Sequence, residues 1–448
     1  MSSPIGICDA VFSRRTLLLV AAILVGLASW HPTFAQLSVS GEYEYYAALG
    51  FKRHQEPLAV RNRLRLRGRY ARHGLMAYSA ARLSNALSDP ERGGQPGPFR
   101  VRLLESFLDL YFDRVDVRIG HQLVVWGQMD GVFITDVVSP LDLTEFLAQD
   151  FTDIRLAVPA IKASYYLDRW SLTGLLVASP MASPIPSRNS RWFALPQAVE
   201  TLDVELGKDN LPNPSPSEVE PGAKVSYSGS EAGLDLIYFY GRNRIPVFSK
   251  SLDITSGSIE RLTLRPDYYR RHVVGARLSS TLPDPFVVES ELAYESMIKV
   301  DVAPSLLLDD PSVLGDLPEL LLNEGHLLGG LALSRTYHGT FVRAQVVGSY
   351  LTRYDDRSAR DRFYDAVTLL IRSTWSNETL VGSLFTYYNP GGDYWLNPML
   401  QYSAGSGLNL FVGAHVFGGD TTAGSLTTAA FGLFDDNDFF FMRLTLAF

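Results

Sequence analysis

The chain contains a single cysteine, Cys8, within an N-terminal segment that we predict to be cleaved. The rest of the protein therefore has no disulfide bond, no thiol nucleophile and no thiolate metal site. Long apolar runs are missing too, because no stretch after residue 35 approaches the eighteen or so apolar residues of a membrane-spanning helix. If the mature chain enters a membrane, it does so as strands and not as helices.

Recognisable catalytic patterns are also absent. The sequence has no HExxH, no GxSxG and no phosphate-binding glycine loop, and its paired aspartates lack the spacing of a calcium-binding loop. His415, which we expect to face inward from a strand, is the best candidate for acid–base chemistry, but a lone polar histidine is far more often a pore-lining residue. We therefore predict that the protein is not an enzyme and has no cofactor and no metal ion.

Excess positive charge is lacking as well, since the net charge of the full chain is −8. Such an acidic chain is no candidate for general nucleic-acid binding.

The first 35 residues have the order of a targeting segment. Arg14 and Arg15 are followed by an apolar run from Thr16 to Leu27 and by the small-residue ending Thr33-Phe34-Ala35. This order predicts a cleaved signal peptide over 1–35 and a single mature domain over 36–448. Cleavage removes Asp9, Arg14 and Arg15, which makes the net charge −9.

The mature sequence alternates between apolar and polar residues in segments of about ten to thirteen residues, the period of half-buried β-strands. We count eighteen such segments, with sixteen as the alternative count. They lie near 38–48, 58–71, 74–83, 102–112, 115–125, 159–168, 170–178, 220–229, 231–241, 270–281, 285–297, 325–336, 339–351, 362–373, 376–388, 391–402, 405–417 and 437–448.

The connections between these segments alternate in length. Short turns, such as 72–73 and 113–114, are followed by long segments, such as 84–101 and 126–158. Short periplasmic turns that alternate with longer extracellular loops are typical of transmembrane antiparallel up-and-down β-barrels. The sequence therefore predicts an all-β barrel of about eighteen strands, with both termini on the periplasmic side.

One strand, near 58–71, carries an arginine at every second position. A lipid-facing Arg or Lys at the bilayer midplane costs ~2–4 kcal/mol, so five such residues must face the lumen. The same argument turns the other charged strand residues inward. The predicted pore-lining residues are Arg61, Arg63, Arg65, Arg67, Arg69, Glu105, Asp109, Asp116, Arg118, Arg277, Glu289, Glu291, Glu295, Arg343, His415 and Arg443.

Two of the long loops have the composition of short helices. Pro140–Leu147 combines helix-start residues with helical apolar spacing, and Val313–Leu322 has leucines at similar intervals. These segments either pack against the barrel wall or mouth, or fold into the lumen and narrow it. The residues alone do not favour one position over the other.

In the last ten residues, every second residue counted back from Phe448 is large and apolar, namely Leu446, Leu444, Met442 and Phe440, and Phe441 is the exception among the residues between them. This pattern resembles the closing strand of Gram-negative outer-membrane barrels, which ends in Phe and is recognised by the barrel assembly machinery. The resemblance implies an outer-membrane protein in contact with lipid and lipopolysaccharide. The first strand must pair with this last one if the barrel is to close.

Residues 116–160 contain the most distinctive internal pattern, in which Gln122 and Trp126-Gly127 are followed by several acidic residues. It resembles a large, mostly uncharacterised family of proteobacterial outer-membrane barrels, similar in appearance to phosphate-selective and alginate-export porins. The chain departs from that pattern at Ser139 and His121. We expect Trp126 to anchor at the membrane interface, Gly127 to permit the strand exit, and ion pairs to brace the loop. The loop residues singled out are Trp126, Gly127, Asp130, Asp136, Pro140, Asp142 and Arg155.

These patterns predict an outer-membrane channel for the passive or selective passage of small charged or polar solutes. The arginine-rich strand is expected to attract anions, with Glu289, Glu291 and Glu295 opposing them on another wall. The alternative is a non-conducting outer-membrane barrel that acts as a lipid-modifying enzyme, for which His415 is the candidate residue, or as a scaffold for envelope partners.

Overall fold

The computed structural model describes the chain from Gln36 onward, so the predicted signal peptide lies outside it. Most of the predicted helix at 313–322 also lies outside the described residues, whereas Leu321 and Leu322 already belong to a strand. The described ranges are 36–51, 57–89, 95–146, 153–188, 190–193, 203–255, 258–284, 286–303, 306, 320–419 and 431–448.

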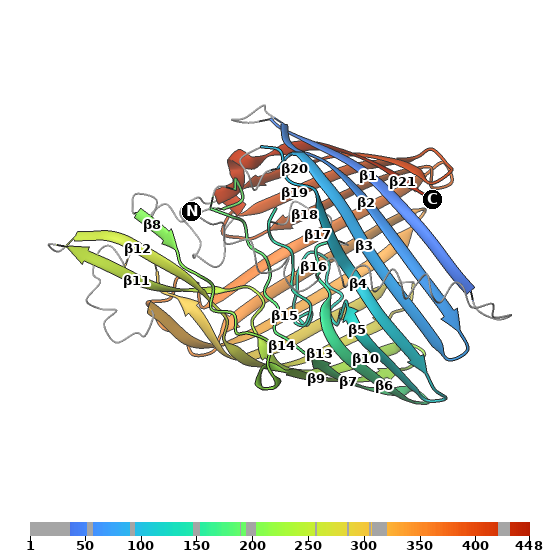
Figure 1. Cartoon of the computed structure of the whole chain (residues 1–448), viewed down its shortest axis with the longest axis horizontal. Coiled ribbons are helices and arrows are strands. Elements are labelled where there is room, and N and C mark those ends of the chain that lie inside the picture. Colours follow the sequence, from blue (N-terminus) through green and yellow to red (C-terminus); the bar gives the residue numbers. More distant parts are fainter. Residues whose placement is uncertain are drawn as a thin grey trace.

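Eighteen strands form one antiparallel sheet that closes on itself, because β1 pairs with β2 on one side and with β21 on the other. Figure 1 shows the tilted strands of this barrel from the side. The barrel strands are β1 (Gln36–Gly50), β2 (Pro57–Arg72), β3 (Leu75–Ser88), β4 (Arg100–Tyr111), β5 (Val115–Gln122), β6 (Val158–Leu167), β7 (Trp170–Val177), β9 (Glu220–Ser228), β10 (Ala232–Arg242), β13 (Arg270–Thr281), β14 (Val287–Asp301), β15 (Leu321–Tyr337), β16 (Thr340–Leu351), β17 (Phe363–Trp375), β18 (Leu380–Tyr388), β19 (Tyr394–Ser403), β20 (Leu408–Gly418) and β21 (Phe439–Ala447).

The predicted barrel is confirmed in strand number, direction and closure. Each of the eighteen predicted segments overlaps one barrel strand, and the first strand meets the last in an antiparallel register that includes Tyr45 opposite Leu444. Eight short turns of two to five residues lie at one end of the barrel. The C-terminus lies at that same end, where Ala447 N–H donates to Gly407 O of the turn between β19 and β20.

A second, three-stranded sheet lies at the opposite end, and the alternation in the sequence did not predict it. It consists of β8 (Asp203–Leu206), β11 (Val247–Thr255) and β12 (Ser258–Asp267), and β12 pairs antiparallel with β11 and parallel with β8. Its apolar residues Val204, Phe248, Leu262 and Leu264 form a small core. Two 3₁₀ helices, η3 (Pro216–Glu218) and η6 (Phe431–Asn437), also lie in the long connections.

A buried ion pair joins the second sheet to the barrel wall. Lys250 Nζ of β11 lies 2.7 Å from Asp301 Oδ1 of β14, and both side chains are at most 1% exposed. Removing either partner of such a pair leaves an uncompensated buried charge, which lowers the stability by several kcal/mol. The ion pair therefore holds the base of the β11–β12 hairpin against the barrel.

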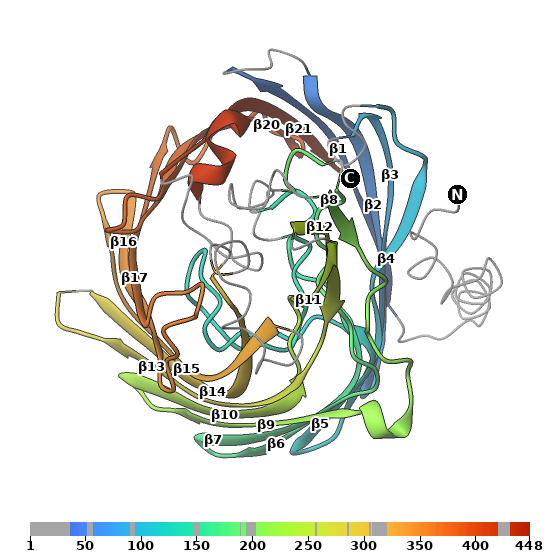
Figure 2. The same ribbon diagram turned by 90° about the vertical axis from the view of Figure 1, so that its left-hand side faces the viewer.

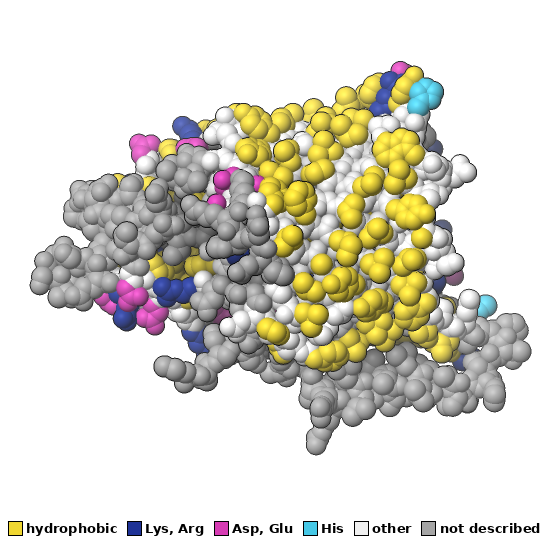
Figure 3. Space-filling model, turned by 90° about the horizontal axis from the view of Figure 1, so that it is seen from above, with side chains coloured by type: hydrophobic (Ala, Val, Ile, Leu, Met, Phe, Trp, Pro, Cys, Tyr) yellow, Lys and Arg dark blue, Asp and Glu magenta, His cyan; other side chains and the backbone are white. Residues whose placement is uncertain are grey.

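The outer face of the barrel is apolar and the inner face is polar, as strand alternation requires. Along β14, Leu292 is 52% exposed on the outside, whereas its neighbour Glu291 is 3% exposed on the inside. On β15 and β16, Leu331 faces outward at 55% and Arg343 is buried at 7%. Figure 3 shows hydrophobic side chains spread over the barrel wall and charged side chains near its ends. No helix in the described residues is both long enough and apolar enough to cross a membrane.

This arrangement predicts the cost of placing a charge on the outer face. Leu292→Arg is expected to lower the free energy of unfolding by ~2–4 kcal/mol, because Leu292 lies in the middle of its strand and faces lipid. Val288→Arg is the matched control, since Val288 has the same outward parity as Leu292 but is the second residue of β14, beside a short turn, where the cost falls to ~0–1 kcal/mol. Urea unfolding in lipid vesicles measures both values. Equal costs for the two variants would contradict the assigned membrane face.

Candidate functional site

The connection between β5 and β6, residues 123–157, lies inside the barrel and is called the inner loop here; its described residues are 123–146 and 153–157. Figure 2, which faces the end with the long connections, shows this segment within the ring of strands. Val124, Trp126, Ile134 and Val138 of the loop are buried against inward side chains of the wall, such as Phe239. These apolar contacts place the loop on the inner surface of the barrel.

Polar side chains of β14 and β16 bind the backbone of the inner loop. The carboxylate of Glu291 accepts hydrogen bonds from Gln128 N–H, from Thr135 N–H at 3.1 Å and from Thr135 Oγ1 at 2.8 Å. The amide of Gln345 bonds both the N–H and the carbonyl of Asp130, at 3.0 and 2.8 Å. Arg343 adds an ion pair with Asp130 at 3.0 Å.

Arginines of β2, β3 and β4 bind the carboxylates of the same loop. Arg61 pairs with Glu145, and both Arg65 and Arg82 pair with Asp153. In addition, Arg102 of β4 lies 2.8 Å from Asp142. These ion pairs attach the second half of the inner loop to the wall formed by β2–β4.

The two sets of contacts lie on opposite walls. Following the paired neighbours around the ring of eighteen, β3 and β15 are nine strands apart. The inner loop therefore crosses the lumen from the β14–β16 wall to the β2–β4 wall. A loop held at both ends by charged and amide side chains narrows the barrel, which is the second of the two positions considered from the sequence.

The predicted helix at 140–147 is wrong over its described residues. Leu141 forms an isolated bridge with Arg155, and residues 144–146 form a turn. The Asp142 carboxylate accepts hydrogen bonds from Thr144 N–H and Oγ1, and Asp142 N–H donates to Ile154 O. Short polar side chains that bond the nearby backbone in this way compete with helix formation. Pro140 contributes a carbonyl that accepts from Leu156 N–H.

Trp126 and Gly127 do not mark the membrane interface, so that interpretation is wrong. Strand β5 ends at Gln122, and Trp126 is only 3% exposed, with its ring edge-on to Phe239 inside the barrel at 6.3 Å. Gly127 is closely packed, because a Cβ there would lie 3.0 Å from Asp136 Cβ and 3.2 Å from Glu291 Oε2, so both neighbours would have to shift slightly for a side chain to fit. The alternation of hydrophobicity alone does not distinguish an interfacial tryptophan from one turned inward.

The arginines of β2 are largely neutralised by carboxylates. Arg63 lies 3.4 Å from Glu44, and Glu42 lies 3.8 Å from Arg65 and 4.0 Å from Arg67. Glu42 and Glu44 were not among the predicted pore-lining residues, although they alternate along β1 as the arginines do along β2. The register places Glu42 opposite Arg65 and Glu44 opposite Arg63, where cross-strand neighbours interact.

The remaining predicted residues also have partners. Asp109 pairs with Arg118 at 2.6 Å, Asp235 with Arg277 at 3.2 Å, Arg271 with Glu295 at 3.2 Å, and Asp136 with Arg155; Arg343 also pairs with Glu289. The other contacts are Glu105 with Leu123 N–H, Asp116 with Tyr166, Arg69 with the Met76 sulfur, and Arg443 over the Phe411 ring.

His415 lies in an aromatic cluster. Its ring stacks on Phe439 at 4.8 Å and on Trp395 at 5.7 Å, and Trp395 Nε1–H donates to His415 Nδ1. The neighbouring cluster gathers Phe146 of the inner loop, Trp192, Phe434 and several wall residues. An imidazole that accepts a hydrogen bond at Nδ1 is the neutral form. His415 thus helps to position aromatic rings on the inner face of β18–β21.

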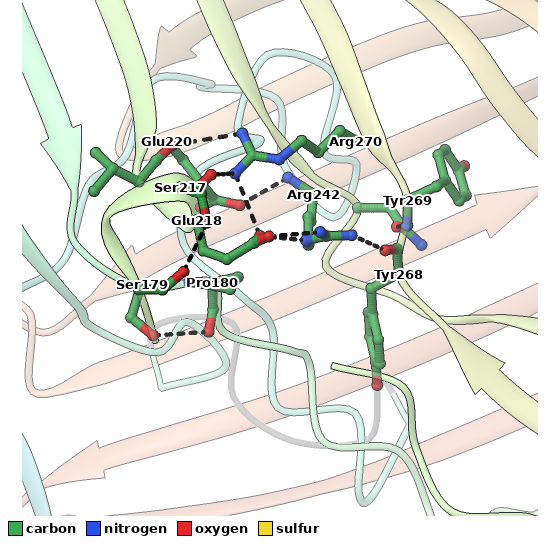
Figure 4. A network of polar contacts seen from close by, with 12 residues as sticks. Ser179, Pro180, Ser217, Glu218, Glu220, Arg242, Tyr268, Tyr269 and Arg270 are labelled. Atoms are coloured by element: carbon green, nitrogen blue, oxygen red, sulfur yellow. Dashed lines mark hydrogen bonds and ion pairs between the residues drawn. The ribbon is translucent and has the colours of Figure 1, made fainter. Parts of the chain in front are cut away.

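A polar network supports the wall next to the second sheet. Glu218 pairs with Arg242 at 2.8 Å and with Arg270 at 3.3 Å, and Arg242 Nη1 donates to Tyr268 O. Figure 4 shows how these residues, with Glu220, converge from η3, β9, β10 and the start of β13. The network fixes both ends of the connection that carries β11 and β12.

No family model and no curated protein matches this chain. Several solved structures match in fold. OccAB1 of Acinetobacter baumannii has a TM-score of 0.53 at 8% identity, covering 92% of this chain and 96% of that chain. A BenF-like porin from Pseudomonas fluorescens Pf-5 gives 0.52 at 10% identity, and OccK8 (OprE) of Pseudomonas aeruginosa gives 0.51 at 9%; both comparisons cover 92% of this chain and 98% of the other. The likeness is one of fold.

The contacts of Asp153 predict how the inner loop responds to acid. Burial alone would raise the pKa of Asp153, but the guanidinium groups of Arg82 and Arg65 outweigh it and lower the pKa. A lowered pKa in the folded state stabilises the protein above the unfolded value of about 3.9, and this stability is lost as the pH falls through the folded pKa. The attachment to β2 and β3 is therefore expected to persist from pH 7 to about pH 5 and to weaken below about pH 4.

Thermal unfolding followed by circular dichroism at pH 7, 5 and 3 measures this effect. Asp153→Asn removes the titrating carboxylate, so the variant is expected to be less stable than wild type at pH 7 and to lose less stability on acidification. If the wild-type protein loses stability between pH 7 and pH 5 and Asp153→Asn does not, the pKa of Asp153 is not lowered.

Proposed function

We propose that the protein is an outer-membrane channel through which small charged or polar solutes pass, either passively or selectively. The observation that supports this most directly is the inner loop, which crosses a lumen lined by charged side chains inside a barrel of eighteen strands. Barrels of 16–18 strands usually enclose an aqueous channel. The fold similarity to a BenF-like porin is consistent with this role.

The location and partners belong to the same proposal. The apolar outer face fits the lipids and lipopolysaccharide of the outer membrane, and the closing strand that ends at Phe448 fits recognition by the barrel assembly machinery. Export through the signal peptide at 1–35 is part of it. The resemblance of residues 116–160 to an uncharacterised proteobacterial barrel family points the same way.

The expected selectivity follows from the balance of charge beside the inner loop. On the β1–β3 wall, the five arginines Arg61, Arg63, Arg65, Arg67 and Arg82 face the four carboxylates Glu42, Glu44, Glu145 and Asp153. On the opposite wall, Glu289 pairs with Arg343 and Glu295 pairs with Arg271, while Glu291 accepts hydrogen bonds from the inner loop. Fixed charges in a narrow passage select ions by sign, so the channel is expected to prefer anions moderately.

Swelling of liposomes that contain the purified protein tests this function. Liposomes in isotonic arabinose or sodium succinate are expected to swell when the protein is present, because solute enters through the barrel. Protein-free liposomes and liposomes with heat-unfolded protein are the controls. If swelling with folded protein matches the protein-free rate for every small solute, the channel function is wrong.

A further inference from the structure

A cavity of about 210 Å³ lies between the inner loop and the β13–β15 wall, near the ends of the strands that carry the long connections. Its walls come from segments far apart in the sequence, including Phe133 of the inner loop, Leu328 of β15 and Arg360 of the connection between β16 and β17. A volume of this size corresponds to roughly seven water molecules and is below the ~300–1,000 Å³ of drug-sized sites. It fits a small solute.

Cations outnumber anions around this cavity. The lining contains four arginine or lysine residues, Arg244, Arg271, Lys299 and Arg360, and two carboxylates, Asp136 and Glu295, which gives an excess of two positive charges. Asp136 is already paired with Arg155, and Arg244 with Glu220 at 2.7 Å. Arg155 and Glu220, which do not line the cavity, add one positive and one negative charge. Counting them therefore leaves the excess of two positive charges unchanged.

The excess lies on Lys299 and Arg360. Arg271 is paired with Glu295 at 3.2 Å, whereas neither Lys299 nor Arg360 has a carboxylate within ion-pair distance among the residues that the structure describes. The β2 wall differs, because there each of the arginines from 61 to 67 has a carboxylate partner. Within the described residues, the cavity is therefore a site in the lumen where carboxylates in ion-pair contact do not balance the cations.

Two of the arginines that line the cavity, Arg271 and Arg360, each have one donor without an acceptor in the part of the chain that the structure describes. The Nε atoms of Arg271 and Arg360 are buried and make no hydrogen bond. Nearly all buried polar atoms in proteins have a partner, so the guanidinium groups of Arg271 and Arg360 are not fully satisfied by the described residues. A guanidinium donates in a planar fork that matches two oxygens of a carboxylate or phosphate. The cavity is also lined by apolar residues such as Phe133, Ile298 and Leu328. They lower the local dielectric constant, which strengthens charged contacts.

We propose that this cavity is a binding site for a small dianion whose charge is carried on oxygen, either a short dicarboxylate or a phosphate. Two negative charges match the excess of two positive charges, and the forks of Arg271 and Arg360 supply the donors. This inference rests on the proposed channel function, since it names the class of solute that the channel retains on its way through.

Isothermal titration calorimetry on the purified full-length protein in detergent tests the site without requiring conduction. Succinate and hydrogen phosphate at pH 8 are the probes, and acetate is the monoanion control. At least one dianion is expected to bind about tenfold or more tightly than acetate, and the comparison of succinate with phosphate tells an organic from an inorganic ligand. If acetate binds as tightly as both dianions, or if neither dianion binds, the proposal is wrong.

Substitution of Arg360 locates the site. Arg360→Gln is expected to weaken binding of the dianion by about tenfold to a hundredfold, because a hydrogen bond to a charged group is lost. Arg357→Gln is the matched control, since Arg357 lies in the same connection but pairs with Asp355 and does not line the cavity. Equal weakening by both substitutions, or none by Arg360→Gln, would contradict the site.

Arg360→Lys separates loss of charge from a general disturbance of the connection. It keeps the positive charge, so it is expected to bind the dianion more tightly than Arg360→Gln; equal affinities would contradict the charge assignment. Binding that persists in a protein without channel activity would refute the proposed function but not the site. Transport with no measurable binding of a dianion would refute the site alone.

Discussion

Glu291→Ala is expected to raise the single-channel conductance several-fold, because it removes one of the three side chains that hold the inner loop on the β14–β16 wall. The carboxylate accepts three hydrogen bonds from Gln128 and Thr135 and is only 3% exposed. Hydrogen bonds to a charged group contribute about 1.5–3 kcal/mol each, and their removal leaves buried donors unsatisfied. The combined loss is on the order of 5 kcal/mol, which loosens residues 128–135 although Gln345 and Arg343 still bind Asp130. Planar-bilayer recording measures the result.

Two further variants control this experiment. Glu291→Gln keeps an acceptor oxygen and is expected to give an intermediate conductance. Glu231→Ala removes an exposed glutamate in the short turn between β9 and β10, far from the inner loop, and is expected to leave the conductance unchanged. If Glu291→Ala folds as a barrel and conducts like wild type, the inner loop does not limit the current.

Asp153→Asn is expected to increase the preference for anions. The carboxylate of Asp153 holds both Arg65 and Arg82, so its removal leaves two guanidinium groups beside the inner loop without this counter-charge. In a narrow, partly dehydrated passage, one unit of fixed charge changes the local concentrations of permeant ions strongly. The reversal potential under a tenfold KCl gradient is expected to shift toward the chloride equilibrium potential by about 10 mV or more.

The control for this substitution is Asp168→Asn, which removes the same charge from the short turn between β6 and β7. Its reversal potential is expected to match wild type, because an exposed charge at the barrel rim is screened by salt. An unchanged reversal potential for Asp153→Asn would remove the arginine wall from the mechanism of selectivity.

The barrel could be predicted from the sequence because two local rules act on every strand. Alternation with a period of two identifies the faces, and the cost of a charge in lipid decides which face is inward. Leu292 and Glu291 illustrate both rules, since adjacent residues differ from 52% to 3% exposure. Even Phe441, the exception in the closing strand, has a reason: it turns inward and stacks on Tyr46 at 5.9 Å.

The site could not be predicted to the same extent because its contacts join residues distant in sequence. Asp153 meets Arg65 across 88 residues, and Thr135 meets Glu291 across 156. No local pattern encodes such pairs. Alternation also fails in the connections, where it missed β8, β11 and β12 and assigned Trp126 to the interface instead of the interior. The roles of Glu42 and Glu44 could have been predicted from the sequence, because a hairpin register between β1 and β2 places them opposite arginines.

Single-channel recording of the wild-type protein in a planar bilayer tests whether the barrel is a channel narrowed by the inner loop. Discrete, small conductance steps are expected, because the inner loop narrows the lumen, together with a reversal potential under a KCl gradient that shows moderate anion preference. Membranes that contain folded protein but show no conductance steps, or steps with clear cation preference, would contradict this expectation.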